Sequence, residues 1–167
     1  FMLQPTVRRT WAPQGHTPIQ HRWDRHDRLS VTGALTVSPV RQRVGLYFSL
    51  VASNITGDEV FAFVQHLRGH RKRPLLLIWD CFSGHKKAAR LLRDLYGTRI
   101  HVEFLPASAP ELNVVAQCWG HTKYSEMANC IPRDVDDLAQ EVAHALLAKH
   151  RRPDLLRAFF QHAQLRL

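Results

Sequence analysis

Alternating apolar and polar residues predict two neighbouring strands near the start of the chain. Between Arg28 and Ser38, leucine and valine alternate with serine and threonine, which is the period-two pattern of a strand with one buried face. Residues 43–52 show a similar pattern. Only the short, turn-like segment Ser-Pro-Val-Arg-Gln separates the two strands, so we expect an antiparallel hairpin.

A helix and a second kind of strand are predicted next. Thr56 and Glu59 have the spacing of a capping box, and apolar residues follow them at helical spacing, so we expect a helix to about residue 69. After a basic loop, the continuous apolar run Leu75–Trp79 is typical of a strand buried on both faces. This strand ends in Asp80.

The rest of the chain alternates helix, strand and helix. The pattern predicts a helix over residues 83–97, a strand over 100–104 and a helix over 111–127. A further helical region begins near Val135 and continues after Pro153. This order predicts a single α/β domain, in which an antiparallel hairpin joins parallel strands and helices flank the mixed sheet.

Composition narrows the possible partners. With 167 residues, 45% of them hydrophobic, the chain is long enough for one domain with a substantial core. The formal net charge of +9 favours a polyanionic partner such as nucleic acid, although charge alone does not decide this. No apolar run approaches the roughly 18 residues of a membrane span. The three cysteines are widely spaced, so we expect reduced thiols, an intracellular protein and no structural zinc.

Asp80 is the leading candidate for chemistry. A carboxylate at the carboxyl end of a buried strand is held rigidly, and hard divalent cations prefer oxygen ligands. The alternative is that Asp80 caps the turn or helix that begins near Ser83. Two-metal phosphoryl transfer needs several carboxylates around ions roughly 4 Å apart, so Asp80 would need acidic partners from other elements.

Several ordered motifs support a family assignment. They are Leu77-Ile78-Trp79-Asp80 with His85, Leu105-Pro106-Ala107-Ser108-Ala109-Pro110-Glu111-Leu112-Asn113 with Trp119 and Lys123, and Arg8-Arg9-Thr10-Trp11-Ala12-Pro13-Gln14-Gly15. Together they resemble the bacterial insertion-sequence branch of the mariner-like transposases, of the DDE type. The resemblance implies a ribonuclease H-like fold, three acids that bind two Mg²⁺ or Mn²⁺ ions, DNA as partner, and a cytoplasmic, nucleoid-associated location.

Residue by residue, the resemblance carries over only the second acid, onto Asp80, as catalytic residue and metal ligand. The first acid belongs on a strand immediately before Phe1, so we expect residues 1–167 to be one ribonuclease H-like domain truncated at its N-terminus. The third acid falls at Ala116, where the family has the glutamate of an Asn-Pro-x-Glu element. Alanine cannot ligate a metal, so we expect impaired cleavage and doubt that this chain binds the metal pair.

Glu111 is a possible substitute acid. It precedes Ala116 by five residues, which would turn it roughly 140° away on a continuous helix. An acid in the first turn of a helix is also favourable for purely structural reasons. Substitution by Glu111 is therefore the weaker interpretation.

Basic residues near these motifs are candidates for DNA contacts. Some follow Asp80 closely and others lie on the helix expected to face the site, whereas the run Arg71–Arg73 is more simply a solvated loop. The candidates are Lys86, Lys87, Arg90, His121 and Lys123.

Three functions remain open. The first is a transposase domain that cleaves DNA and joins it to a target. The second is a decayed or domesticated fragment that retains DNA binding or self-association, which Ala116 favours. The third is an unrelated ribonuclease H-like nuclease that combines Asp80 and Glu111 with Asp24 or Asp27. Without the first strand, the sheet would have a gap beside the strand that ends at Asp80, so we expect self-association, with a homodimer as one form.

Overall fold

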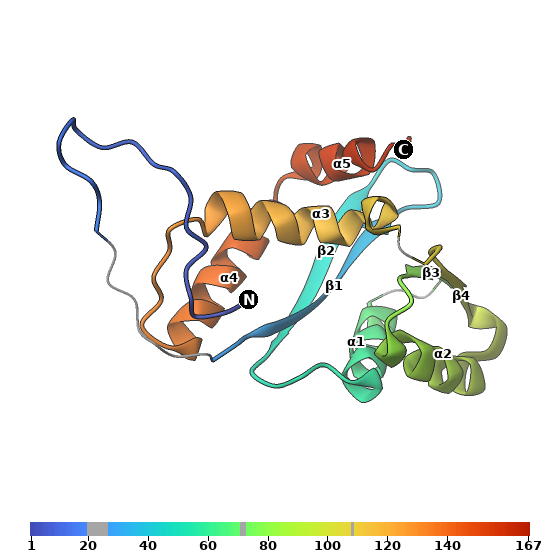
Figure 1. Cartoon of the computed structure of the whole chain (residues 1–167). Coiled ribbons are helices and arrows are strands. Elements are labelled where there is room, and N and C mark those ends of the chain that lie inside the picture. Colours follow the sequence, from blue (N-terminus) through green and yellow to red (C-terminus); the bar gives the residue numbers. More distant parts are fainter. Residues whose placement is uncertain (20–26, 71–72, 108) are drawn as a thin grey trace.

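A computed structural model describes residues 1–19, 27–70, 73–107 and 109–167. The described part of the chain has a mixed α/β fold, with an antiparallel hairpin and a separate parallel pair of strands (Figure 1). The elements are β1 (Ser30–Val37), β2 (Val44–Val51), α1 (Gly57–Gly69), β3 (Leu75–Trp79), α2 (Ser83–Tyr96), β4 (Ile100–Phe104), α3 (Val114–His121), α4 (Val135–His150) and α5 (Pro153–His162). Within the described ranges, no helix is long and apolar enough to cross a membrane.

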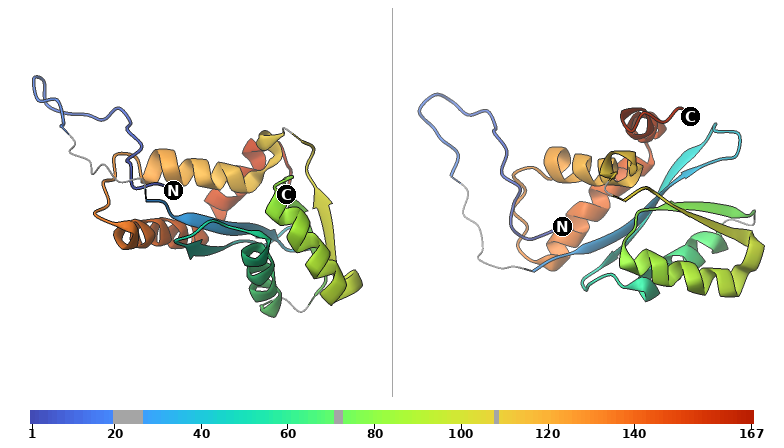
Figure 2. Two further views of the ribbon diagram at one scale, coloured as in Figure 1. Left: turned by 60° about the horizontal axis from the view of Figure 1, so that its bottom comes forward. Right: turned by 45° about the vertical axis from the view of Figure 1, so that its right-hand side comes forward.

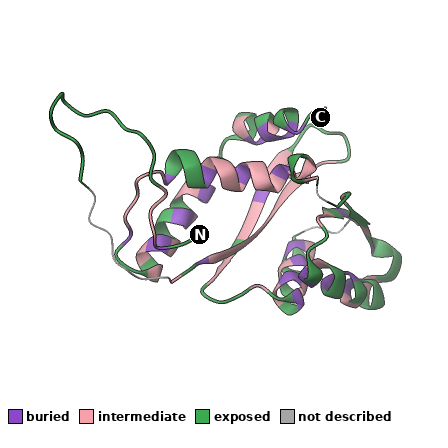
Figure 3. Ribbon diagram, in the orientation of Figure 1, coloured by how far each residue is buried: buried purple, intermediate pink, exposed green. Residues whose placement is uncertain are grey.

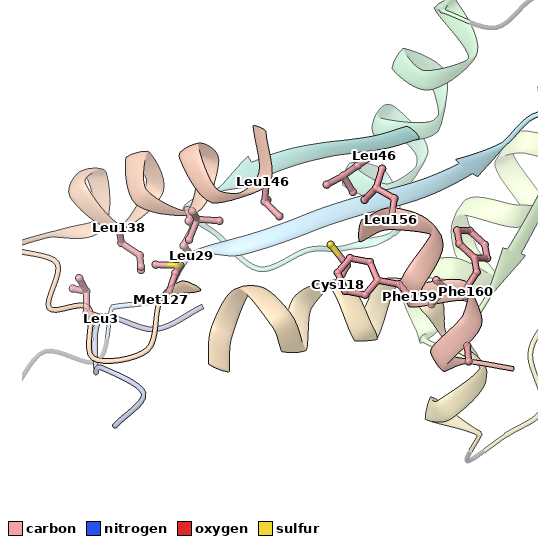
Figure 4. Packing of buried hydrophobic residues seen from close by; sticks show 13 residues of the cluster. Leu3, Leu29, Leu46, Cys118, Met127, Leu138, Leu146, Leu156, Phe159 and Phe160 are labelled. Carbon is pink, nitrogen blue, oxygen red and sulfur yellow. The ribbon is translucent and has the colours of Figure 1, made fainter. Parts of the chain in front are cut away.

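The predicted hairpin is confirmed. β1 and β2 pair antiparallel in a register that runs from Ser30 opposite Val51 to Val37 opposite Val44. α3 packs against β1, whereas α4 and α5 pack against β2 (Figure 2). Helix and hairpin side chains together form the larger core, which Figure 4 shows from close by. Its fully enclosed members include Leu46, Cys118, Leu138, Val142, Leu146 and Leu156.

The parallel pair β3–β4 has a smaller core of its own. α1 and α2 pack against each other, and Val64 and Leu92 meet Leu77 and Ile100 there. The predicted capping box of α1 is present, because Thr56 accepts from the Asp58 backbone N–H and the Glu59 carboxylate accepts from the Thr56 backbone. This half of the molecule is thus held together by helix packing on one face of a short strand pair.

The prediction that β3 is buried on both faces is wrong. Leu76 is 62% and Ile78 is 61% exposed, whereas Leu77 is buried. Figure 3 shows how buried, intermediate and exposed residues are distributed over the elements. Because side chains alternate along a strand, Leu77 points to one face of β3, and Leu76 and Ile78 point to the other. Residues of α1 and α2 pack against the face that carries Leu77. The apolar run therefore has one covered and one open face.

The expected gap in the sheet is present. In the described residues β3 pairs with β4 alone, and β1 pairs with β2, so β1 and β3 each have an edge without a strand beside it. A single residue pair at the chain start, Met2 with Arg28, forms an antiparallel bridge just before β1. In the described residues the hairpin and the parallel pair are therefore two separate two-stranded sheets.

Candidate active site

Asp80 lies directly after β3, in the loop that leads into α2. One carboxylate oxygen, Oδ1, accepts a hydrogen bond from the Phe82 backbone N–H at 3.1 Å. Phe82 is the N-cap residue of α2 and offers no side-chain cap itself. Asp80 therefore supplies the structural cap that was one of its two expected roles, while about half of its side chain, 47%, remains exposed.

His85 holds the same carboxylate oxygen from the first turn of α2. Its Nδ1 lies 2.7 Å from Asp80 Oδ1, so that a proton on Nδ1 is donated to the carboxylate. The His85 ring stacks on Trp79, with centroids 4.9 Å apart and an angle of 21° between the planes. The Phe82 ring meets it edge-on at 5.4 Å. Packing thus fixes the imidazole, and the imidazole in turn orients Asp80.

Asn113 reaches Asp80 from a distant part of the sequence. Its Nδ2 donates to the other carboxylate oxygen, Oδ2, at 3.3 Å. Asn113 is also the N-cap residue of α3. This contact joins the end of β3 to the start of α3, and it therefore brings Asp80 close to the helix turn that contains Ala116. Asn113 belongs to one of the motifs that support the family resemblance, but its spacing along the sequence predicts no role for it.

Ala116 lies in the first turn of α3, where its N–H donates to the Asn113 carbonyl at 2.9 Å. It lines a cavity of about 570 Å³ that extends along the start of β1. The other lining residues are Phe1, Met2, Arg28, Leu29, Ser30, Val31, Ile55, Trp119, Gly120, Lys123 and Tyr124. None of the residues that line this cavity is acidic, and Arg28 and Lys123 are its basic members, so Ala116 faces no carboxylate there.

The residues around Asp80 do not fit a pair of divalent ions. In residues 1–19, 27–70, 73–107 and 109–167, no three His, Cys, Asp or Glu side chains converge so that they could hold a metal. The side chains bonded to Asp80 are an imidazole and an amide, whereas a two-metal site requires several carboxylates. The chemistry of this donor set therefore does not provide the site that the resemblance implies.

Glu111 is not in the first turn of α3, contrary to the helix predicted over residues 111–127. It lies in a short 3-10 turn, Pro110–Leu112, and is exposed. Asn113 has an extended backbone, with φ −82° and ψ 93°, which separates this turn from α3. The rotation argued from a continuous helix does not apply, and the role of Glu111 as a substitute acid stays a prediction.

The third hypothesis depends on Asp24 or Asp27 in addition to Asp80 and Glu111. Asp24 lies outside the described residues. The Asp27 backbone carbonyl accepts from the Leu3 N–H at 3.0 Å, next to the Met2–Arg28 bridge at the start of the hairpin.

The three basic candidates on α2 differ in their surroundings. Lys86 and Arg90 are exposed, and neither forms an ion pair with another described residue. Lys87 pairs with Asp58 at the start of α1, with Nζ 2.6 Å from Oδ2. Its side chain also covers Gly57, since a Cβ built there would lie 2.6 Å from Lys87 Cβ. Lys87 thus links two helices, while Lys86 and Arg90 are available to an anion. Arg71 and Lys72 lie outside the described residues.

His121 and Lys123 also differ. His121 is half-buried against Phe159 of α5, with ring centroids 5.6 Å apart. Burial, together with Lys149 and Arg152, lowers the pKa of His121, which favours the neutral ring. Lys123 is exposed, lines the cavity beside Ala116, and holds its ammonium 5.3 Å from the centre of the Tyr124 ring. Of the two, Lys123 has the charge and the position for a phosphate contact.

Two of three comparisons with known proteins found a match. A family model described as DDE superfamily endonuclease matches residues 1–139. A search of the solved structures matches a chain of the Mos1 strand transfer complex with a TM-score of 0.62 and 14% sequence identity. The match covers 98% of this chain and 49% of that chain, so this chain spans about half of its length. No curated protein matches. The structural likeness confirms the mixed α/β, ribonuclease H-like fold class.

Proposed function

Since this chain belongs to the DDE superfamily endonucleases, we propose that it is the ribonuclease H-like domain of a DNA transposase that moves an insertion sequence. The observation that carries the proposal is the placement of Asp80, which is oriented by His85 and Asn113 where the end of β3 meets the start of α3. The likeness to a chain from a strand transfer complex supports it. We further propose residues 1–167 as one domain that acts on DNA in the bacterial nucleoid.

We propose that cleavage by this chain is impaired. Endonucleases of this superfamily generally depend on divalent metal ions. Among the described residues Asp80 has no carboxylate partner, and Ala116 places a methyl group where the third acid is expected. Loss of such a ligand removes stabilisation of the charge that develops in the transition state, worth several kcal/mol.

We propose that the first acid belongs to a strand that joins the chain at Phe1. The Phe1 amino group donates to the Leu29 carbonyl at 2.7 Å, and the Leu29 N–H donates to the Phe1 carbonyl at 2.8 Å. With the neighbouring bridge from Met2 to Arg28, this makes the first residues run antiparallel to the start of β1. Residues joined before Phe1 in the same direction would continue along the open edge of β1.

Two repairs test this proposal together. Ala116→Glu restores the third acid, and an N-terminal extension of alternating valine and threonine with one aspartate supplies the first. Gln117→Glu, which adds the same side chain one residue later, is the matched control. We expect the doubly repaired chain to bind Mn²⁺ and nick supercoiled DNA, and the Gln117→Glu chain with the same extension to do neither. If the unmodified chain already binds two ions and cuts DNA, the assignment of the acids is wrong.

DNA binding is a separate part of the proposal. Lys86 and Arg90 lie four residues apart on α2 and therefore on the same helix face, just beyond Asp80. Binding to labelled duplex DNA should weaken as salt increases, and Lys86→Ala or Arg90→Ala should each reduce the slope of the log–log salt plot by about one. Arg133→Ala is the control, because Arg133 is exposed but paired with Asp137. Equal slopes in all variants would contradict a DNA-facing α2.

The second candidate function is a non-catalytic fragment that binds DNA or associates with itself. The open strand edges and the exposed Leu76 and Ile78 favour it, because unpaired edges and apolar strand faces promote pairing between chains. Light scattering across a concentration series should show dimers or larger species, and Leu76→Lys with Ile78→Lys should reduce them. A monomer at every concentration would contradict self-association.

A further inference from the structure

Two histidines face each other at the C-terminal end of α1. His66 and His70 are four residues apart, so they lie on one side of the helix. Their Nε2 atoms are 3.3 Å apart, and the rings meet edge to face with centroids 4.9 Å apart. Both residues are exposed, and neither contacts the group around Asp80 through any hydrogen bond or ring contact of the described residues.

We propose that His66 and His70 form a binding site for a divalent transition-metal ion of the zinc, nickel and copper class. Two nitrogens that each lie about 2.0–2.1 Å from a tetrahedral ion are about 3.3–3.4 Å apart, which is the separation seen here. The two rings are therefore arranged to chelate an ion with little movement. The same separation also permits an N–H···N hydrogen bond between the rings, whose direction depends on the tautomers.

Among the described residues, few protein ligands surround the His66–His70 pair. The Tyr47 ring lies beside His70, with centroids 6.3 Å apart, and no described carboxylate or thiol completes a three-ligand group. Because both imidazoles are exposed, water would fill the remaining coordination positions. Because the described residues supply only two ligands, the site should be weaker than a closed structural zinc site with four.

Metal preference separates this site from the one around Asp80. Neutral imidazole suits Cu²⁺, Ni²⁺ and Zn²⁺, whereas Mg²⁺ takes oxygen ligands. The order of affinity should be Cu²⁺ above Ni²⁺ and Zn²⁺, and excess Mg²⁺ should not compete.

Calorimetric titration of the whole chain with ZnCl₂ in a non-chelating buffer tests the proposal. We expect one Zn²⁺ per chain. Loss of an outer-shell partner alone weakens metal sites about ten- to a hundredfold, so His66→Ala and His70→Ala should each weaken binding at least about tenfold. His144→Ala removes an exposed histidine from α4 and should leave the affinity unchanged. Circular dichroism checks that each variant is folded.

Electron paramagnetic resonance of the Cu²⁺ complex provides an independent measurement. The spectrum should show two equatorial nitrogen ligands in the original chain and one in each single variant. If the original chain binds no Zn²⁺, or if all three alanine variants bind it equally, the pair is a hydrogen-bonded contact and the proposal is overturned.

Discussion

A buried ion pair between α4 and the turn after α3 leads to a quantitative prediction. The Lys149 side chain is fully buried, and its ammonium pairs with the Glu126 carboxylate. Glu126 ends a π-helical turn, Thr122–Glu126, that follows α3. Burial lowers the pKa of Lys149 to about 8. The variant Glu126→Gln keeps the shape of this partner and removes its charge.

The expected loss of stability depends on pH. Removing one partner of a buried ion pair commonly costs about 3–5 kcal/mol. In Glu126→Gln, Lys149 can avoid a buried, unpaired charge by releasing its proton. With a pKa of about 8, this release costs roughly 1.4 kcal/mol for each pH unit below 8. The loss in Glu126→Gln should therefore be limited to about 1 kcal/mol at pH 7 and about 3 kcal/mol at pH 6, and it should be close to zero at pH 9.

The original chain should show the matching pH dependence. Lys149 has a lower pKa in the folded protein, about 8, than its ordinary value of 10.5. Between these values the unfolded chain binds more protons, so the contribution of Lys149 to stability rises with pH through this window. Below about pH 8 the lysine is charged in both states, and its contribution no longer changes with pH.

Urea unfolding at pH 6, 7, 8 and 9 measures these quantities. Glu103→Gln makes the same chemical change at an exposed position on β4 and should have little effect. A loss of 3 kcal/mol or more in Glu126→Gln at pH 7, unchanged at pH 9, would refute the argument that deprotonation of Lys149 limits the loss.

Three further predictions concern packing, capping and a buried thiol. A Cβ at Gly33 would lie 2.6 Å from Trp119 Cη2, so Gly33→Ala should reduce the free energy of unfolding by about 1–3 kcal/mol. A Cβ at Gly120 would meet no atom within 4 Å, so Gly120→Ala should not reduce it. Thr56→Ala removes the N-cap of α1 and should reduce it by about 1 kcal/mol, measured by the urea midpoint. Burial raises the pKa of Cys118 from 9.0 to about 11. Between these pH values the folded chain binds more protons than the unfolded chain, so the contribution of Cys118 to stability falls as pH rises. In Cys118→Ala the free energy of unfolding should not show this decline.

Much of the candidate site could be predicted from short motifs. The position of Asp80 at the end of a strand follows from residue identity and from spacing within one element. That Ala116 stands where the family has an acid stays a prediction. The hydrogen bond from Asn113 to Asp80 could not be predicted in this way. It joins residues 33 positions apart, and its length depends on how α3 begins relative to β3. The break at Asn113 likewise moved Glu111 out of the helix.

The sequence by itself determined the local elements, because their causes are local: side-chain alternation produced the hairpin, and Thr56 with Glu59 started α1. Only the tertiary structure decided which apolar residues are buried. Leu76 and Leu77 are chemically identical, yet one is exposed and the other lies beneath two helices. Burial depends on what packs against a residue, and the hydrophobic pattern within one strand does not show whether another strand or helix covers each of its faces.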